Sequence, residues 1–189
     1  MDRRDLLKQT CGMGLCACAA SGIMAQASQA GEAGPAPQDT DRQLKRLQWW
    51  QDHTKKQIAK LWALLEPHLD EKTRLNIIEQ LGRNCASMLG WARQFKGNTE
   101  GFFQKMKESQ GEELTFDKEK GIITVTTPER DCVCGLVNSK ITPAYFCQCS
   151  IGWQKETYET ILGKKVEVEL KESVLRGSKR CVFRIHVLS

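Results

Sequence analysis

The chain has 189 residues, of which 40% are hydrophobic and 27% are charged, and its formal net charge is +5. This balance is typical of a globular domain, and the length allows one domain of ordinary size after a leader. Lysine and arginine are interleaved with glutamate and aspartate and form no basic stripe with aromatic platforms, which argues against a nucleic-acid-binding protein.

Residues 1–30 are predicted to be a signal peptide. A charged start is followed by a mildly apolar run and by small residues that offer cleavage points, and the run is too short for a transmembrane helix. The segment RRDLLK at residues 3–8, with Arg3 and Arg4, resembles the twin-arginine (Tat) export motif. This resemblance implies the Tat machinery as a partner and a periplasmic or other extracytoplasmic location. The alternatives are an ordinary secretory leader, and a lipoprotein with Cys18 as the lipidated residue.

Residues 31–40, rich in Gly, Ala and Pro, are predicted to form a flexible linker. We expect a single α+β domain over residues 41–189. Its helical part covers residues 41–110 and its cysteine-rich α+β part covers residues 112–189.

Two long helices are expected first. Apolar residues recur from Asp41 onward at steps of three and four until Pro67 ends the helix, and they form the stripe Leu44, Leu47, Trp50, Thr54, Ile58, Leu61 and Leu65. A second helix begins at about Asp70 with the apolar face Leu75, Ile78, Leu81, Cys85, Met88 and Leu89. Gly82 costs about 1 kcal/mol within a helix, which indicates that another element packs close to the backbone there.

Shorter elements follow. Asn98 is a predicted cap for a helix that ends near Gly111, and strands at residues 114–116 and 122–126 form a hairpin whose loop needs a positive φ at Gly121. A helix over residues 150–162 with Ser150 as N-cap precedes strands at 166–170 and 181–187. The predicted fold class is α+β, with N-terminal helices packed with an antiparallel sheet and a C-terminal helix.

Cysteines dominate the second half of the chain. Of nine cysteines, three leave with the leader, and the six that remain are Cys85, Cys132, Cys134, Cys147, Cys149 and Cys181. Cys132 and Cys134 share a face if their segment is extended. The positive end of the helix from Ser150 is expected to lower the pKa of Cys147 and Cys149. Soft ligands at this density predict either a thiolate metal site or disulfides, and Cys85 is either a further ligand or a buried thiol.

The C-terminal half resembles two related domain families. The matching segments are FCQCSIGW at 146–153, ILG at 161–163, VEV at 166–168, Glu172, Gly177 and CVF at 181–183. They are similar to the 4-vinyl reductase domain and to the family named after L-2-amino-thiazoline-4-carboxylic acid hydrolase. The resemblance implies an α+β domain around a small-molecule or zinc pocket. It also implies Cys181 as the closing cysteine of a zinc site, with Glu172 as an additional ligand.

Three functions therefore remain open. The first is an exported cysteine-rich domain that binds zinc, or an iron–sulfur cluster, or a small ligand. The second is a disulfide-stapled binding domain without metal. The third is a hydrolase of a small thiazoline- or amide-like substrate, an activity that the family resemblance alone suggests.

Overall fold

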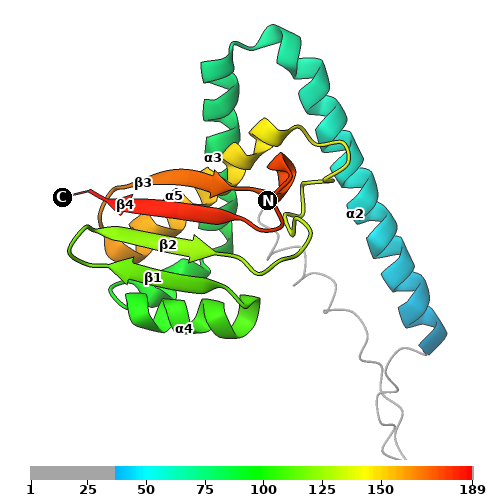
Figure 1. Ribbon diagram of the computed structural model, residues 1–189. Coiled ribbons are helices and arrows are strands. Elements are labelled where there is room, and N and C mark those ends of the chain that lie inside the picture. Colours follow the sequence, from blue (N-terminus) through cyan, green and yellow to red (C-terminus); the bar gives the residue numbers. More distant parts are fainter. Residues whose placement is uncertain (1–36, 189) are drawn as a thin grey trace, which may run out of the picture. The chain divides into compact units, whose positions relative to one another are not determined.

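The computed structural model describes residues 37–188, which contain four α-helices and a four-stranded antiparallel sheet (Figure 1). The helices are α2 (Pro37–Leu65), α3 (Glu71–Leu89), α4 (Thr99–Gln110) and α5 (Gln148–Leu162), and the strands are β1 (Glu113–Asp117), β2 (Ile122–Thr126), β3 (Val166–Glu172) and β4 (Val182–Val187). Short 3-10 turns are η1 (Glu66–His68), η2 (Trp91–Phe95), η3 (Ala144–Cys147) and η4 (Val174–Arg176). The predicted α+β class is confirmed.

The sheet order is β1-β2-β4-β3, so the last strand lies in the middle of the sheet. Ile123 of β2 faces Ile185 of β4 in the register, and both side chains are fully buried. The predicted hairpin of β1 and β2 is confirmed, with Gly121 at a φ of 65° between the strands. Gly121 adopts this conformation without the steric cost that a side chain would add.

Several predicted helix ends are also confirmed. Asp70 is the N-cap of α3 and its carboxylate accepts a hydrogen bond from the Thr73 backbone N–H at 3.0 Å. Asn98 caps α4 by accepting from the Gly101 N–H, and Gly111 ends that helix. Such caps satisfy backbone groups that a helix end leaves without partners.

The start of α2 differs from the prediction. The helix begins at Pro37 rather than Asp41, so residues 37–40 of the predicted linker are helical. Proline is favoured in the first turn of a helix, where its missing N–H is not needed. Residues 31–36 and the predicted signal peptide lie outside the described residues.

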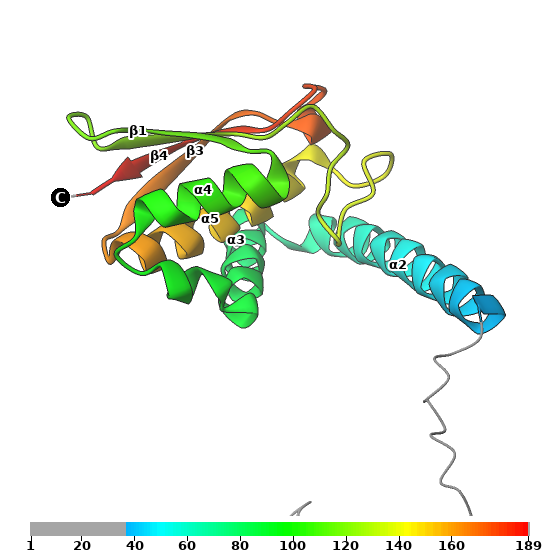
Figure 2. The ribbon, with the colours of Figure 1, turned by 90° about the horizontal axis from the view of Figure 1, so that it is seen from below.

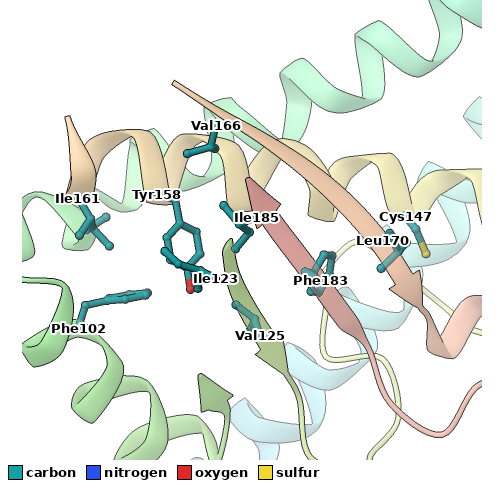
Figure 3. Packing of buried hydrophobic residues seen from close by; sticks show 11 residues of the cluster. Phe102, Ile123, Val125, Cys147, Tyr158, Ile161, Val166, Leu170, Phe183 and Ile185 are labelled. Carbon is teal, nitrogen blue, oxygen red and sulfur yellow. The ribbon is translucent and has the colours of Figure 1, made fainter. Parts of the chain in front are cut away.

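Helices α3, α4 and α5 cover one face of the sheet in two layers. Figure 2 shows α4 and α5 against the sheet and α3 on the far side of α5. Figure 3 shows the main core between α4, α5 and the sheet, where Phe102 and Tyr158 lie edge to face at 5.6 Å and Cys147 lies beside Leu170 at one end. Full burial of a large apolar side chain contributes about 1.5–3 kcal/mol, so this cluster supplies much of the folding free energy.

A close helix crossing joins α3 to α5. A Cβ on Gly82 would overlap the carbonyl oxygen of Cys149, and a Cβ on Gly152 would overlap the carbonyl oxygen of Glu79. The two glycines therefore let the helix backbones touch, as the position of Gly82 in the sequence predicts. Arg83 stabilises the same crossing by ion pairs. Its guanidinium nitrogens lie 3.1–3.6 Å from carboxylate oxygens of Glu79 on α3 and of Glu156 and Glu159 on α5.

We predict that Gly82→Ala destabilises the domain. The added methyl group has no room between the two backbones, and overpacking of this kind costs about 1–3 kcal/mol, more than the helix propensity that alanine gains. The melting temperature measured by circular dichroism should fall by about 5 °C or more. Asn84→Ala, on the exposed side of the same helix, is the control and should leave the melting temperature unchanged or slightly raised. Equal melting temperatures for the two variants would contradict the close crossing.

Candidate functional site

Five cysteines from separate parts of the chain line one small cavity. They are Cys132 and Cys134 from the segment after β2, Cys147 and Cys149 from the start of α5, and Cys181 from the approach to β4. The remaining lining residues are Val137, Phe146, Ser150, Ser173, Val174 and Leu175. The cavity volume is about 20 Å³. This is room for one water molecule or one metal ion, and far less than the several hundred Å³ of an ordinary small-molecule site.

The start of α5 brings two of these thiols inward. Cys147 ends η3 and is the residue before α5, so that Cys149 stands in the first turn of the helix. Ser150 was predicted to be the N-cap, but it lies within the helix, and Cys147 occupies the cap position with no side-chain hydrogen bond to the helix. The helix begins earlier because η3 leads into it without an extended residue between them.

The segment with Cys132 and Cys134 is not extended as a strand, so the condition under which the two thiols would share a strand face is not met. It is a loop with few regular hydrogen bonds, one of which joins the Val137 N–H to the Cys134 carbonyl at 3.1 Å. The preceding residues are tied to the end of the chain, because the Thr127 hydroxyl accepts from the Cys181 N–H at 2.9 Å. Loop geometry, rather than strand alternation, therefore turns both thiols towards the cavity.

Cys134 and Cys149 form a coupled pair. The Cys149 thiol donates a hydrogen bond to the Cys134 sulfur, which lowers the pKa of Cys134 to about 6 and raises the pKa of Cys149. The positive charge of Lys55 and backbone N–H groups of the following loop add to the lowering at Cys134. At neutral pH the pair therefore holds one thiolate and one thiol.

The other two central thiols are neutral. Burial raises the pKa of Cys132, and it raises the pKa of Cys147 even though Cys147 has a hydrogen bond with the Ser173 hydroxyl at 2.9 Å. The expectation that the N-terminus of α5 lowers the pKa of Cys147 and Cys149 is therefore wrong. Desolvation and sharing of a proton outweigh the helix dipole at these buried positions.

Two of the predicted ligands do not line the cavity. Cys85 on α3 does not line the cavity, yet burial and then the charge of Cys134 raise its pKa, which places it near the coupled pair. Glu172 does not line the cavity either, and its carboxylate lies 3.5 Å from the guanidinium of Arg180. Arg3 and Arg4 of the predicted export motif lie outside the described residues.

All six cysteines of the described residues are free thiols. Within residues 37–188, no group of three or more His, Cys, Asp and Glu side chains has an arrangement that holds a metal ion as it stands. The same part of the chain has no helix with the length and apolar character needed to cross a membrane.

Two contributors to this site were missed by sequence reasoning. Lys55 acts on Cys134 from α2, 79 residues earlier in the chain, and Ser173 holds Cys147 from the end of β3. Lysine and serine are common on helix surfaces and in turns, so neither residue carries a signal in the sequence. Only the folded chain, in which α2 and the residue after β3 act on these cysteines, identifies them.

Comparison with known proteins gives a family but no activity. A family model described as "Family of unknown function (DUF6144)" matches residues 39–189, and no curated protein matches the chain. One similar solved structure is a trafficking protein particle complex subunit 3 from Naegleria fowleri covalently bound to palmitic acid, with 15% identity, coverage of 75% of this chain and 97% of that one, and a TM-score of 0.48. Another is a vinyl-4-reductase family protein from Methanocaldococcus jannaschii, with 14% identity, coverage of 84% and 85%, and a TM-score of 0.37. At such identities and scores, neither neighbour says what this chain does.

We predict that Cys134 reacts as a thiolate in mildly acidic solution. In the reduced, metal-free protein, the rate of its alkylation by iodoacetamide should rise with pH to half its maximum at about pH 6, because the thiolate is the reactive form. Cys149→Ala removes the hydrogen-bond donor and should move this midpoint to higher pH. Cys181→Ala is the matched control and should not move it. Mass spectrometry of the labelled peptides measures each rate, and one shared midpoint for the three proteins would contradict the coupled pair.

Proposed function

Because the chain belongs to this family of unknown function (DUF6144), we propose a function from its own residues: the cysteine cavity binds one zinc ion through thiolates. The observation that carries the proposal is the meeting of five thiols, from segments far apart in the sequence, around a space of about 20 Å³. A space of this size suits one ion. Cysteine thiolates are the usual ligands of structural zinc.

Position around the cavity suggests which thiols bind the ion. Cys132, Cys134, Cys147 and Cys149 all line it, as two close pairs from two segments of the chain. A closed structural zinc site takes four sulfurs, and we therefore propose these two pairs as the ligands. Cys181 also lines the cavity and is the fifth candidate, whereas Cys85 does not line it.

Zinc fits this group better than an iron–sulfur cluster does. A tetrahedral zinc ion takes four cysteine sulfurs in a closed structural site, whereas a cluster needs room for several iron and sulfide atoms. Cys134 already favours the thiolate form that a metal requires. The other sulfurs would have to turn towards the ion, and the loop after β2 has few hydrogen bonds that resist such a change.

A disulfide between Cys134 and Cys149 is the second candidate. Their hydrogen bond puts the two sulfurs side by side, and Cys134 as a thiolate is suited to thiol–disulfide exchange. The hydrolase alternative has less support, since the cavity is too small for an organic substrate and no histidine is among the residues that line it. A structural disulfide in place of a metal ion would suit an oxidising compartment.

We predict that the full-length chain, produced in a reducing cytoplasm with zinc in the medium, contains about one zinc ion per chain by mass spectrometry of the metal. Cys134→Ser and Cys149→Ser should each reduce this content to less than about a tenth. A strong chelator should lower the melting temperature, because zinc stabilises only the folded state. The matched controls are Cys85→Ser and Cys181→Ser, which remove thiols outside the proposed set and should keep the zinc.

Two results would contradict zinc binding. The first is a protein without metal whose thiols all react freely with a thiol reagent and whose melting temperature is the same with and without the chelator. The second is a metal-free protein in which peptide mapping finds Cys134 joined to Cys149, which supports the disulfide instead. Loss of zinc in the two control variants alone would assign the site to a different set of cysteines.

We further propose that the protein is exported by the twin-arginine route to an extracytoplasmic space. Support comes from the paired Arg3 and Arg4 at the start of a charged and mildly apolar leader. This route carries folded proteins, so zinc bound in the reducing cytoplasm would travel inside the domain. The route therefore agrees with a thiolate site that an oxidising compartment would otherwise threaten.

We predict that replacing both Arg3 and Arg4 by Lys reduces export at least tenfold, measured by immunoblotting of periplasmic and cytoplasmic fractions. Lys8→Arg, a conservative change outside the arginine pair, is the control and should leave export unchanged. Continued export of the double variant that stops when the general secretory pathway is inhibited would show an ordinary secretory leader. A Cys18→Ser change that releases a membrane-bound form would show lipidation instead.

A further inference from the structure

One complete helix face of α2 has no partner within the described residues. The positions Gln43, Leu47, Trp50, Thr54, Gln57, Leu61 and Leu64 are all exposed and follow one another at alternating steps of four and three. Leu47 and Leu64 are 65% and 63% exposed, and Trp50 and Leu61 are each 49% exposed. We call this row of seven positions the α2 seam. Alternating steps of this kind are the spacing of the contact positions of a coiled coil.

The α2 seam is separate from the face by which α2 joins its own domain. Ala59 and Trp62 are buried, and Trp62 lies edge to face with Phe146 at 6.0 Å. These contacts hold the C-terminal half of the helix, while every residue from 40 to 52 is exposed. A helix segment without packing is marginally stable in water. We therefore expect a partner to cover the α2 seam.

We propose that the partner is a second copy of this chain, and that two α2 helices pair along their seams in antiparallel orientation. In this pairing Leu47 of one copy faces Leu64 of the other, Trp50 faces Leu61, and Thr54 faces Gln57. Apolar side chains then meet apolar ones at both ends, and the two polar side chains meet at the centre, where they can exchange hydrogen bonds.

Charge favours the antiparallel orientation. Residues 53–65 contain Lys55, Lys56 and Lys60 and no acidic residue, whereas residues 41–52 hold two aspartates beside three basic residues. Parallel pairing would bring the two lysine-rich halves together. Antiparallel pairing places each of them along the more balanced half of the partner, which lowers the repulsion.

The attachment of the helix favours the same orientation. Each domain is held on the C-terminal half of its α2, so a parallel pair would bring both domains to one end of the helices and an antiparallel pair separates them. It also lets the uncovered N-terminal half of one helix lie along the C-terminal half of the other. Thr54 and Gln57 at the centre of the seam argue against a lipid surface, where they would enter hydrocarbon without partners.

The area agrees with a weak dimer. Residues 43–64 span about 33 Å, and a strip about 10 Å wide on each helix has an area of about 330 Å². The pair would bury roughly 660 Å², which is below the usual size of stable protein–protein interfaces and fits a weak, transient association. The inference stands apart from zinc binding, because no cysteine belongs to the seam.

Sedimentation velocity of the full-length chain tests the proposal. The wild-type protein should pass from monomer to dimer as its concentration rises through the micromolar range. Leu47→Lys and Leu64→Glu should each remain monomeric at concentrations at least tenfold above the wild-type midpoint. Ala63→Lys and Ala63→Glu place the same charges on an exposed position outside the seam and should dimerise like the wild type. Circular dichroism confirms that every variant keeps its helix content.

A charge exchange tests the orientation. The double variant Leu47→Lys with Leu64→Glu should recover the dimer, since antiparallel pairing puts lysine against glutamate at both ends. Leu47→Lys with Leu61→Glu does not create this match and should stay monomeric. A wild-type chain that is monomeric at every concentration would overturn the proposal, and so would dimers that all the seam variants retain. Co-sedimentation of such a monomer with phosphatidylglycerol vesicles, lost in Leu47→Lys, would assign the seam to lipid instead.

Discussion

The contact between the backbones of α3 and α5 is the constraint on which the cysteine site depends. Gly82 and Gly152 bring the helices so close that each glycine lies against a carbonyl of the other helix. One of these carbonyls belongs to Cys149, so the same contact sets the position of its thiol. Arg83 and the carboxylates around it fix the rotation of the two helices. The sulfurs of α5 therefore sit on a rigid base, and the loop that carries Cys132 and Cys134 must adapt to them.

Burial and charge oppose each other within the cavity. Cys147 belongs to the main core, whereas Cys149 belongs to a second apolar cluster with Trp62 and Ile78, so the thiols lie between two dry regions. Each ionised sulfur raises the cost of ionising the next one, and hydrogen bonds, loop N–H groups and Lys55 allow a single thiolate, Cys134. A divalent cation would offset the repulsion of further thiolates. This is the physical argument for the proposed zinc ion at a place where so many cysteines meet.

The sequence predicts much of this arrangement, and the failures have identifiable causes. Local signals are strong at Asp70, Asn98 and Gly121, where one residue satisfies a helix end or allows a turn, and the structure confirms all three. The meeting of the cysteine pairs also follows from their density in the chain. The sequence leaves open whether residues 132–134 are extended, because alternation over three residues does not distinguish a strand from a loop, and the structure has a loop there.

Other features depend on contacts between distant elements, which periodicity does not reveal. Helical spacing identifies the apolar stripe of α2 but not what covers it, and Leu44, Leu47 and Trp50 are exposed in the folded chain. The pKa of Cys134 depends on a proton shared with Cys149 and on a lysine from another helix. A pattern of residue types within one segment contains neither fact, because both arise from packing.

Helix α2 connects the two proposals through its opposite faces. The charge of Lys55 helps to lower the pKa of Cys134, while Thr54 and Gln57, on either side of Lys55 in the sequence, belong to the exposed seam. Half of α2 has no support from its own domain, so its order is expected to depend on the partner helix. Pairing would also keep the helix turn with Lys55 in place, and a fixed positive charge beside Cys134 favours its thiolate. The helix that looks peripheral in the fold is thus the element through which self-association could stabilise the cysteine site.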